Sequence, residues 1–102
     1  MADYPIELEA DSGLPLAVIP AAVCRMFGIE EQRRLEVTLP DGSKVERGVG
    51  QCEMTVEGRR GTCSVFLGER LDRPVMGWVT LQELGLMLDP FTRMVKVMVI
   101  GR

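Results

Sequence analysis

Short stretches in which apolar and polar residues alternate, separated by turn-forming residues, constrain the fold of this chain more than any other feature. Every second residue is apolar in residues 6–10 and again in residues 35–39, which is the period of a strand with one buried face. Comparable β-favouring runs occur at residues 16–19, 43–56, 61–67, 74–77, 86–88 and 94–100. Many short strands at this spacing predict a small β-barrel or sandwich.

Two dipeptides predict β-hairpins. Asp41-Gly42 separates the run at residues 35–39 from the run that begins at Ser43, and Glu57-Gly58 separates the next two runs. Glycine readily adopts the positive φ that a tight turn requires. We therefore expect hairpins at both positions, with a two-residue turn at Asp41-Gly42.

One short helix is predicted near the C-terminus. Thr80 and Glu83 have the spacing of a capping box, and Gly85 follows as a C-cap, so the helix is expected at residues 80–84. Residues 20–27, which precede a glycine, are compatible with a further helical turn or two.

Size and charge limit the organisation and the partners of the chain. Its 102 residues suffice for one domain, expected at residues 1–102. The net charge of −3 argues against a nucleic-acid partner, because phosphate binding requires a clustered positive surface. No apolar run approaches the roughly 20 residues of a membrane span, and the N-terminus lacks the pattern of a signal peptide. A cytoplasmic protein without a membrane partner is expected.

The chain contains three cysteines and no histidine. Cys24, Cys52 and Cys63 are widely spaced and odd in number, which favours buried free thiols over a disulfide framework or a zinc site. Without histidine, Ser-His and Cys-His nucleophilic catalysis are excluded, as are His-ligated metals. Carboxylates are then the natural acid–base groups, with Lys44 and Lys96 as amine alternatives, and no cofactor is expected.

Large sulfur-containing and aromatic side chains are expected to serve packing. Met76, Met87, Met94 and Met98 are interpreted as core residues, because methionine fills irregular gaps. Trp78 is expected to pack against the C-terminal helix, with a place in a binding subsite as the alternative.

The tripeptide Asp11-Ser12-Gly13 is the main candidate for chemistry. It places a carboxylate at the end of a predicted strand, followed by a hydroxyl and a glycine. Taken alone, these residues are also typical of an ordinary turn. Whether the tripeptide is a catalytic motif or an ordinary turn therefore depends on the motifs in the rest of the chain.

The order of motifs resembles the retropepsin-like aspartic proteases, including their small single-domain bacterial members. Asp11-Ser12-Gly13 resembles the family's Asp-Thr/Ser-Gly. The other matching segments are Leu16-Ala17-Val18-Ile19-Pro20, Leu39-Pro40-Asp41-Gly42, Val75-Met76-Gly77, Leu81, Leu84-Gly85-Leu86 and Leu88-Asp89-Pro90. They resemble, in turn, the apolar segment with its proline, the flap hairpin, the apolar-apolar-Gly motif, the short helix and the usual ending. The resemblance covers about residues 6 to 90.

The resemblance implies an all-β fold, a small closed acid-protease barrel with one short C-terminal helix. It also implies an aspartic endopeptidase that acts on peptides or proteins as a homodimer. Asp11 would be the catalytic carboxylate, Ser12 would bond across the two-fold axis and Gly13 would allow close approach of the backbone. The remaining site residues would be Leu14 beside the catalytic loop, Pro40, Asp41 and Gly42 in the flap, and Val75, Met76 and Gly77 packed under the loop.

Three departures from the family pattern leave other functions open. Leu14 stands where the family has a small residue, and Glu9 introduces a carboxylate close to the catalytic one. Only ten residues precede Asp11, so a strand of the family fold is missing there or supplied by residues 94–100. A pseudo-protease that binds peptides without cleaving them is the first alternative. A structural or assembly β-domain is the second, and a filled groove beneath the Asp41-Gly42 hairpin would favour it.

Overall fold

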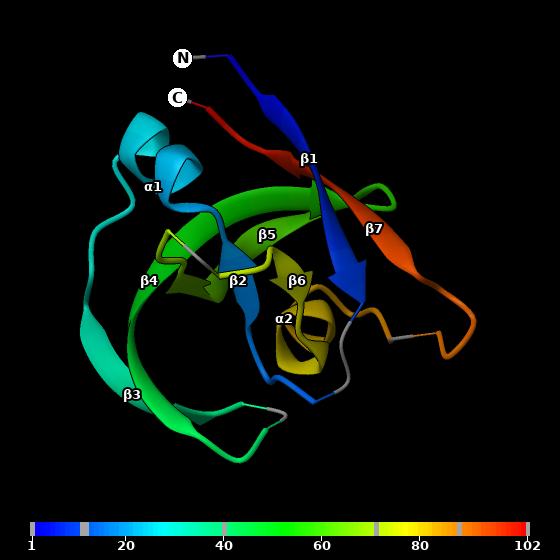
Figure 1. Ribbon diagram of the computed structural model, residues 1–102. Coiled ribbons are helices and arrows are strands. Elements are labelled where there is room, and N and C mark those ends of the chain that lie inside the picture. The colour runs from blue at the N-terminus through cyan, green and yellow to red at the C-terminus, as the bar shows by residue number, and fades with distance from the viewer. Residues whose placement is uncertain (1, 11–12, 40, 71, 88, 102) are drawn as a thin grey trace.

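The computed structural model describes residues 2–10, 13–39, 41–70, 72–87 and 89–101. Over these residues the chain is mostly β and forms seven strands and two short helices (Figure 1). The elements are β1 (Tyr4–Ala10), β2 (Ala17–Ile19), α1 (Ala21–Phe27), β3 (Arg33–Thr38), β4 (Lys44–Val56), β5 (Arg59–Leu67), β6 (Val75–Met76), α2 (Trp78–Glu83) and β7 (Met94–Val99). Within the described part of the chain, no helix has the length and apolarity needed to span a membrane.

The strands form one mixed sheet in the order β2-β5-β4-β7-β1-β6, and β3 pairs with the first half of β4. β1 is parallel to β6 and β2 is parallel to β5, whereas the other neighbours are antiparallel. The sheet curls until its two end strands, β2 and β6, touch, but among the described residues they share no ladder (Figure 1). The prediction of a closed barrel is therefore wrong. β6 has two residues, between Pro74 and Gly77, and in the described part of the chain it pairs with β1 alone.

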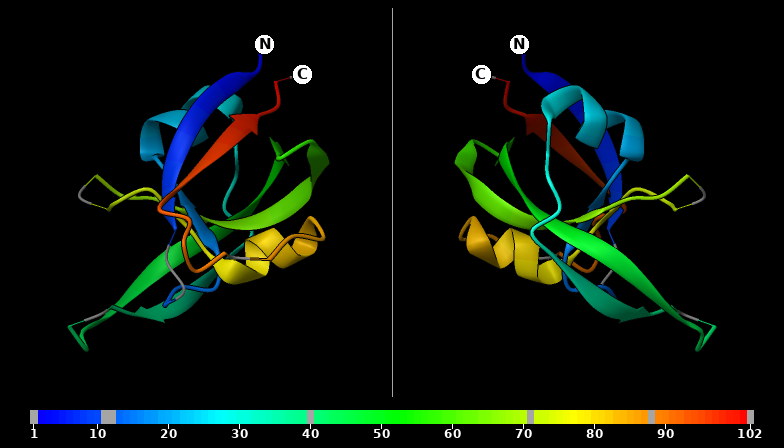
Figure 2. Two further views of the ribbon diagram at one scale, coloured as in Figure 1. Left: turned by 90° about the vertical axis from the view of Figure 1, so that its right-hand side faces the viewer. Right: turned by 90° about the vertical axis from the view of Figure 1, so that its left-hand side faces the viewer.

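β4 is the longest strand and connects the two halves of the molecule. It pairs with β3 through residues 44–49, with β5 through residues 49–56, and with β7 through residues 54–55. Figure 2 shows the β3–β4 hairpin extending as a two-stranded ribbon beyond the rest of the sheet. The ribbon therefore lies where it can cover a neighbouring surface of the molecule.

The two predicted hairpins are confirmed, but one has a different turn. Glu57 and Gly58 both have positive φ, at 49° and 76°, and form a two-residue turn. The β3–β4 connection is instead five residues long, from Leu39 to Ser43, and within it Leu39 N donates to Ser43 O at 2.8 Å. Asp41 Oδ1 accepts from Ser43 N at 2.9 Å and from Ser43 Oγ at 2.6 Å, and these bonds lower the pKa of Asp41. Pro40 lies outside the described residues.

The helix prediction was incomplete. The possible helical turns at residues 20–27 form α1, so two helices are present over the described residues instead of one. α2 begins at Trp78, after Gly77, and no side chain caps it. The capping-box prediction is wrong because Thr80 lies inside the helix with its side chain buried. Its hydroxyl accepts from Ala17 N at 2.8 Å and donates to Ser64 O at 3.0 Å.

The predicted strand at residues 86–88 is also wrong where the structure describes it. Leu86 and Met87 have no strand conformation, and residue 88 lies outside the described residues. Gly85, with a φ of +75°, ends the helical turn and Leu86 N donates to Leu81 O at 2.9 Å. The chain therefore stays close to α2 here and does not join the sheet.

Two clusters of buried side chains hold the fold together. The main core lies between α1, α2 and the strands β1, β2, β4, β5, β6 and β7. Its buried members are Leu8, Ala17, Ile19, Val23, Cys24, Cys52, Met54, Val56, Cys63, Val65, Met76, Leu81, Leu84, Val95, Val97 and Val99. The hairpin-side cluster lies beneath the β3–β4 hairpin and consists of Leu16, Val18, Val37, Val49, Phe66 and Val75. The three cysteines are buried free thiols, as expected.

The methionines do not all follow the expected pattern. Met76 is fully buried, but Met87 is 86% exposed, and Met94 and Met98 are also exposed. The prediction that Met87, Met94 and Met98 are core residues was therefore wrong. Trp78 is likewise exposed at the start of α2.

Candidate functional site

Asp11 and Ser12 lie outside the described residues, but the chain on both sides of them is defined. β1 ends at Ala10, whose N–H donates to Arg93 O at 2.9 Å. The last two residues of β1 pair in parallel with Val75 and Met76 of β6. The chain returns to the sheet at Ala17, the first residue of β2. The candidate tripeptide therefore falls in a connection between two strands that both belong to the sheet.

The first turn of α2 holds the second half of this connection. Trp78 N donates to Leu14 O at 3.3 Å, and Val79 N donates to Pro15 O at 2.8 Å. A Cβ on Gly77 would lie 2.5 Å from the backbone of Pro15 and of Leu16, so glycine permits this close approach. The structure thus places Gly77 directly against the segment that follows the tripeptide.

A cavity of about 240 Å³ lies between this segment and the β3–β4 hairpin. Its lining is formed by Leu14, Val18, Val37, Leu39, Val45, Arg47, Phe66, Asp72, Arg73 and Val75. The structure therefore brings two predicted site residues, Leu14 and Val75, together with both strands of the hairpin. Asp41 and Gly42 lie at the exposed tip, and Met76 points into the main core, so these three do not line the cavity.

One end of the cavity is charged. Arg47 donates from Nε to Asp72 Oδ2 at 2.6 Å and from Nη2 to Asp72 Oδ1 at 2.8 Å. Glu69 approaches the same guanidinium at 3.6 Å, and its N–H donates to Asp72 Oδ2 at 2.8 Å. The hydrogen bonds from Arg47 lower the pKa of Asp72, and those to Asp72 raise the pKa of Arg47. This pair ties β4 to the segment that precedes β6.

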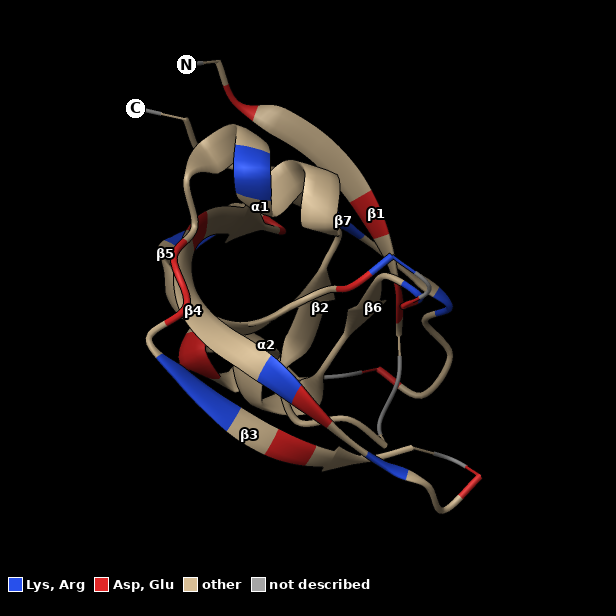
Figure 3. Cartoon of the chain, turned by 60° about the vertical axis from the view of Figure 1, so that its left-hand side comes forward, with Lys and Arg blue, Asp and Glu red and all other residues tan. Residues whose placement is uncertain are grey.

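Sequence reasoning missed the Arg47–Asp72 pair because the two residues are 25 positions apart and neither belongs to a local motif. The apolar lining was accessible in part, since Val37 and Leu39 share the predicted inward face of one run. Figure 3 shows acidic and basic residues interspersed along β3 and β4.

Glu9, whose extra carboxylate is one of the departures from the family pattern, has a positively charged partner. Its carboxylate forms an ion pair with Arg73, which also lines the cavity. The extra carboxylate beside the tripeptide is therefore compensated by a positive charge. Both side chains remain partly exposed, so solvent also screens them.

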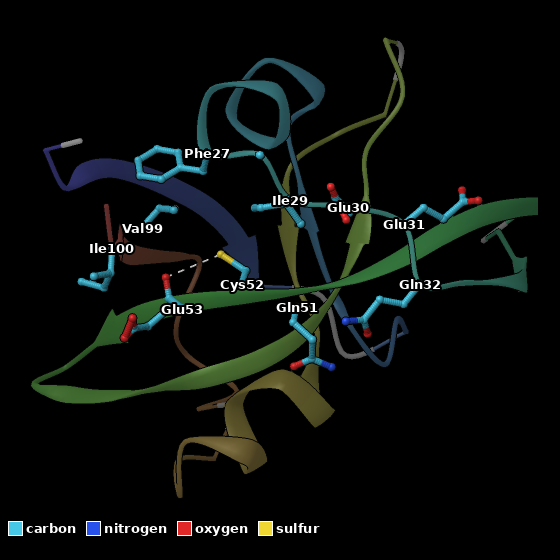
Figure 4. Close-up of a pocket in the computed structure, with 11 residues that line it drawn as sticks. Phe27, Ile29, Glu30, Glu31, Gln32, Gln51, Cys52, Glu53, Val99 and Ile100 are labelled. Carbon is cyan, nitrogen blue, oxygen red and sulfur yellow. Dashed lines mark hydrogen bonds between the residues drawn. The ribbon is translucent and has the colours of Figure 1, made fainter. Parts of the chain in front are cut away.

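A second cavity, of about 420 Å³, lies at the other side of β4 between residues 28–32 and residues 99–100 (Figure 4). The carboxylates of Glu31 and Glu53 on its rim bind Arg34 and Arg60. Figure 4 shows the side chains of Glu31 and Glu53 pointing away from each other. The polar groups of this cavity do not converge on one point, so we place the candidate site in the smaller cavity under the hairpin.

No protein-family model, curated protein or solved structure matches this chain. The resemblance to retropepsin-like proteases therefore rests on the order of motifs in the sequence.

Proposed function

We propose that this chain is a retropepsin-like aspartic endopeptidase, which acts as a homodimer on peptide or protein substrates in the cytoplasm. Asp11 of each copy supplies one carboxylate of a pair that shares a single proton, since two carboxylates a few Å apart cannot both be ionised. One carboxylate acts as general base on a water molecule, and the other donates a proton to the scissile carbonyl. The pair titrates as a unit.

The observation that carries this proposal is the cavity of about 240 Å³ beneath the β3–β4 hairpin. It is bounded by Leu14, one residue beyond the tripeptide, and by Val75 of β6. An empty, largely apolar space between a hairpin and a supported loop suits the side chain of an extended peptide. A filled groove at this position would instead favour a structural domain without a binding site.

The support behind the loop is consistent with a catalytic role. Backbone bonds from α2 reach Leu14 and Pro15, and Thr80 binds the N–H of Ala17. These contacts fix the backbone that follows the tripeptide on a helix and a sheet. Reacting groups held by rigid elements keep the geometry that proton transfer requires.

A pseudo-protease of the same architecture is the second candidate. Leu14 lines the cavity, so its side chain takes space next to the tripeptide that a small residue would leave open. Such a protein would bind extended peptides in the same cavity without cleaving them.

The test is cleavage of a mixed peptide library between pH 4 and 7 by the native protein, by Asp11→Asn and by Glu57→Gln. Glu57 lies in the turn between β4 and β5 and does not line the candidate cavity, so Glu57→Gln removes a carboxylate outside the site. We expect the native protein and Glu57→Gln to cut the same bonds and Asp11→Asn to cut none. Equal cutting by all three would assign the activity to a contaminating protease. A folded dimer that binds peptides but cuts none would leave the pseudo-protease.

A further inference from the structure

The connection between α2 and β7 carries the most exposed large apolar side chains among the described residues. Phe91 is 91% exposed, Met87 is 86% exposed and Met94 is 46% exposed. Single apolar residues are common on protein surfaces, but here three large ones are exposed within eight positions of the sequence. We call Met87, Asp89, Phe91, Arg93 and Met94 together the Phe91 surface.

The Phe91 surface adjoins the candidate catalytic connection. Arg93 O accepts from the N–H of Ala10, the residue before Asp11, and Met94 pairs with Glu9 in the β1–β7 ladder. Figure 1 shows the orange connection beside the lower end of β1, on the side of the molecule away from both termini. A partner that covers this surface would therefore lie next to the end of β1, which the tripeptide follows in the sequence.

The charges of the Phe91 surface are self-complementary. Asp89 and Arg93 are both exposed and stand on either side of Phe91 in the sequence. Asp89 Oδ1 accepts a backbone bond from Phe91 N at 2.9 Å. Among the described residues neither side chain takes part in an ion pair. In a two-fold contact, residue i of one copy meets residue j of the other and the reverse, so one acid and one base on the same patch can form two pairs.

We propose that the Phe91 surface binds the same surface of a second copy of this chain about a two-fold axis. Phe91 and its methionine neighbours supply the apolar centre, and Asp89 of each copy faces Arg93 of the other. This inference rests on the proposed function, because the protease site is incomplete without a second copy. The interface lies beside the end of β1, so assembly brings the two 11–13 connections towards each other.

The test uses charge exchange in an Asp11→Asn background, which prevents self-cleavage. The dissociation constant of the dimer is measured by sedimentation equilibrium for Asp89→Arg, for Arg93→Asp and for the double exchange. Each single exchange sets like charges opposite each other twice, and we expect it to raise the dissociation constant at least tenfold. The double exchange restores both attractions and should return the constant to near its original value. A mixture of the two single variants should form a heterodimer.

Two further variants separate the interface from general effects of charge and of folding. Arg25→Asp makes the same charge change on α1 and should leave the dissociation constant unchanged. Phe91→Ser should weaken the dimer while the circular dichroism spectrum stays native, because Phe91 is almost fully exposed.

The outcomes distinguish the interface from the protease function. A chain that is monomeric at all concentrations, or a dimer insensitive to both exchanges and to Phe91→Ser, would overturn the proposed interface. If the dimer follows the charge exchanges but the native protein cleaves no peptide, the interface stands and the protease proposal falls. If the native protein cleaves peptides but its dimer is insensitive to the charge exchanges, the protease proposal stands and the proposed interface falls.

Discussion

The main core and the hairpin-side cluster are built from strands with the same alternating pattern, but they are filled to different degrees. In the main core, β7 buries Val95, Val97 and Val99. In the hairpin-side cluster, β3 buries Val37 alone, although it has the same length as β7. The two strands also differ in pairing: β7 lies between β4 and β1, whereas β3 pairs with β4 alone.

This difference has a functional meaning. A strand with neighbours on both edges is held in place and packs tightly, which leaves little room for a ligand. The β3–β4 hairpin is held along one edge, and a cavity remains beneath it. The less filled region is therefore where an extended peptide can enter. The following predictions test whether the two regions differ in this way.

The largest difference is expected from large-to-small substitutions. Met54 is fully buried in the main core, whereas Leu39 is half-buried at the edge of the cavity. Met54→Ala should lower the free energy of unfolding by about 2–5 kcal/mol, through lost burial and a new cavity. Leu39→Ala should cost about 1 kcal/mol or less, because part of its surface is already open. Urea unfolding at a fixed protein concentration measures both, and equal costs would contradict the comparison.

The next largest effect is expected where β6 joins the two regions, since Val75 belongs to the hairpin-side cluster and Met76 to the main core. Gly77→Ala places a Cβ 2.5 Å from the backbone of Pro15 and should lower the free energy of unfolding by about 1–3 kcal/mol. The control is Gly61→Ala, whose Cβ meets the flexible end of Leu84 at 3.0 Å. Thermal unfolding of the two variants should separate them, and similar melting temperatures would refute a rigid joint at Gly77.

A smaller effect is expected from the ion pair at the end of the cavity. Asp72→Asn should lower the free energy of unfolding by about 1–2 kcal/mol at pH 7, because it leaves the partly buried Arg47 without its carboxylate. The pKa of Asp72 is lowered in the folded state, so this stabilisation is present above the unfolded value of about 3.9 and is lost as the pH falls through the folded value. Urea unfolding from pH 2 to 7 should therefore show native protein and variant converging in acid.

The exposed pair of Lys44 and Glu36 provides the control for that measurement. Its atoms are 3.6 Å apart and both side chains are largely in solvent. Glu36→Gln should change the free energy of unfolding by less than about 0.5 kcal/mol at any pH. A cost as large as that of Asp72→Asn would show that position in the fold does not matter for these pairs.

The smallest effect on stability at neutral pH, and the clearest contrast in reactivity, concerns the thiols. All three native cysteines belong to the main core, and burial raises the pKa of Cys52 to about 12 and of Cys63 to about 11. They should resist a disulfide reagent at pH 8 and react fully in denaturant. Val45→Cys, at the cavity, should add one thiol that reacts in the native state. Protection of this new thiol as well would contradict the open hairpin side.

The raised pKa values of Cys52 and Cys63 predict that the protein loses stability in alkali. Their folded pKa values lie above the ordinary value of about 8.5, so the stabilisation is present below that pH. It is lost as the pH rises through about 11 to 12. Urea unfolding between pH 8 and 11 should show a falling free energy, and the slope should decrease in a Cys52→Ala variant.

A strand such as β7 could be predicted from the sequence because one of its faces is buried, and a buried face leaves a period of two in the apolar residues. The start of α2 could not, because the hydroxyl of Thr80 binds the N–H of Ala17, 63 positions away, where a local pattern suggests a cap. Barrel closure was likewise inaccessible, since it depends on whether the two end strands, β2 and β6, which are far apart in the sequence, pair with each other.

The candidate site likewise has features that the sequence predicts and features that it does not. Alternation brought Val37 and Leu39 to one face, and the motif order singled out Leu14, Val75 and Gly77. The exposed positions of Met87 and Met94 could not be predicted, because a methionine has the same apolar character in a core and on a surface.

The position of β1 in the sheet has a consequence for how the chain reaches its native state. Its ladder partners are β6 and β7, so the first strand finds its first neighbour about 65 residues later along the chain. Gly101 N also donates to Asp3 Oδ1, a contact across 98 positions. Contacts of such long range make folding slow, in the range of milliseconds to seconds for β-proteins. While residues 1–70 are being synthesised, β1 therefore lacks both of its partner strands, and its unpaired edges are open to aggregation.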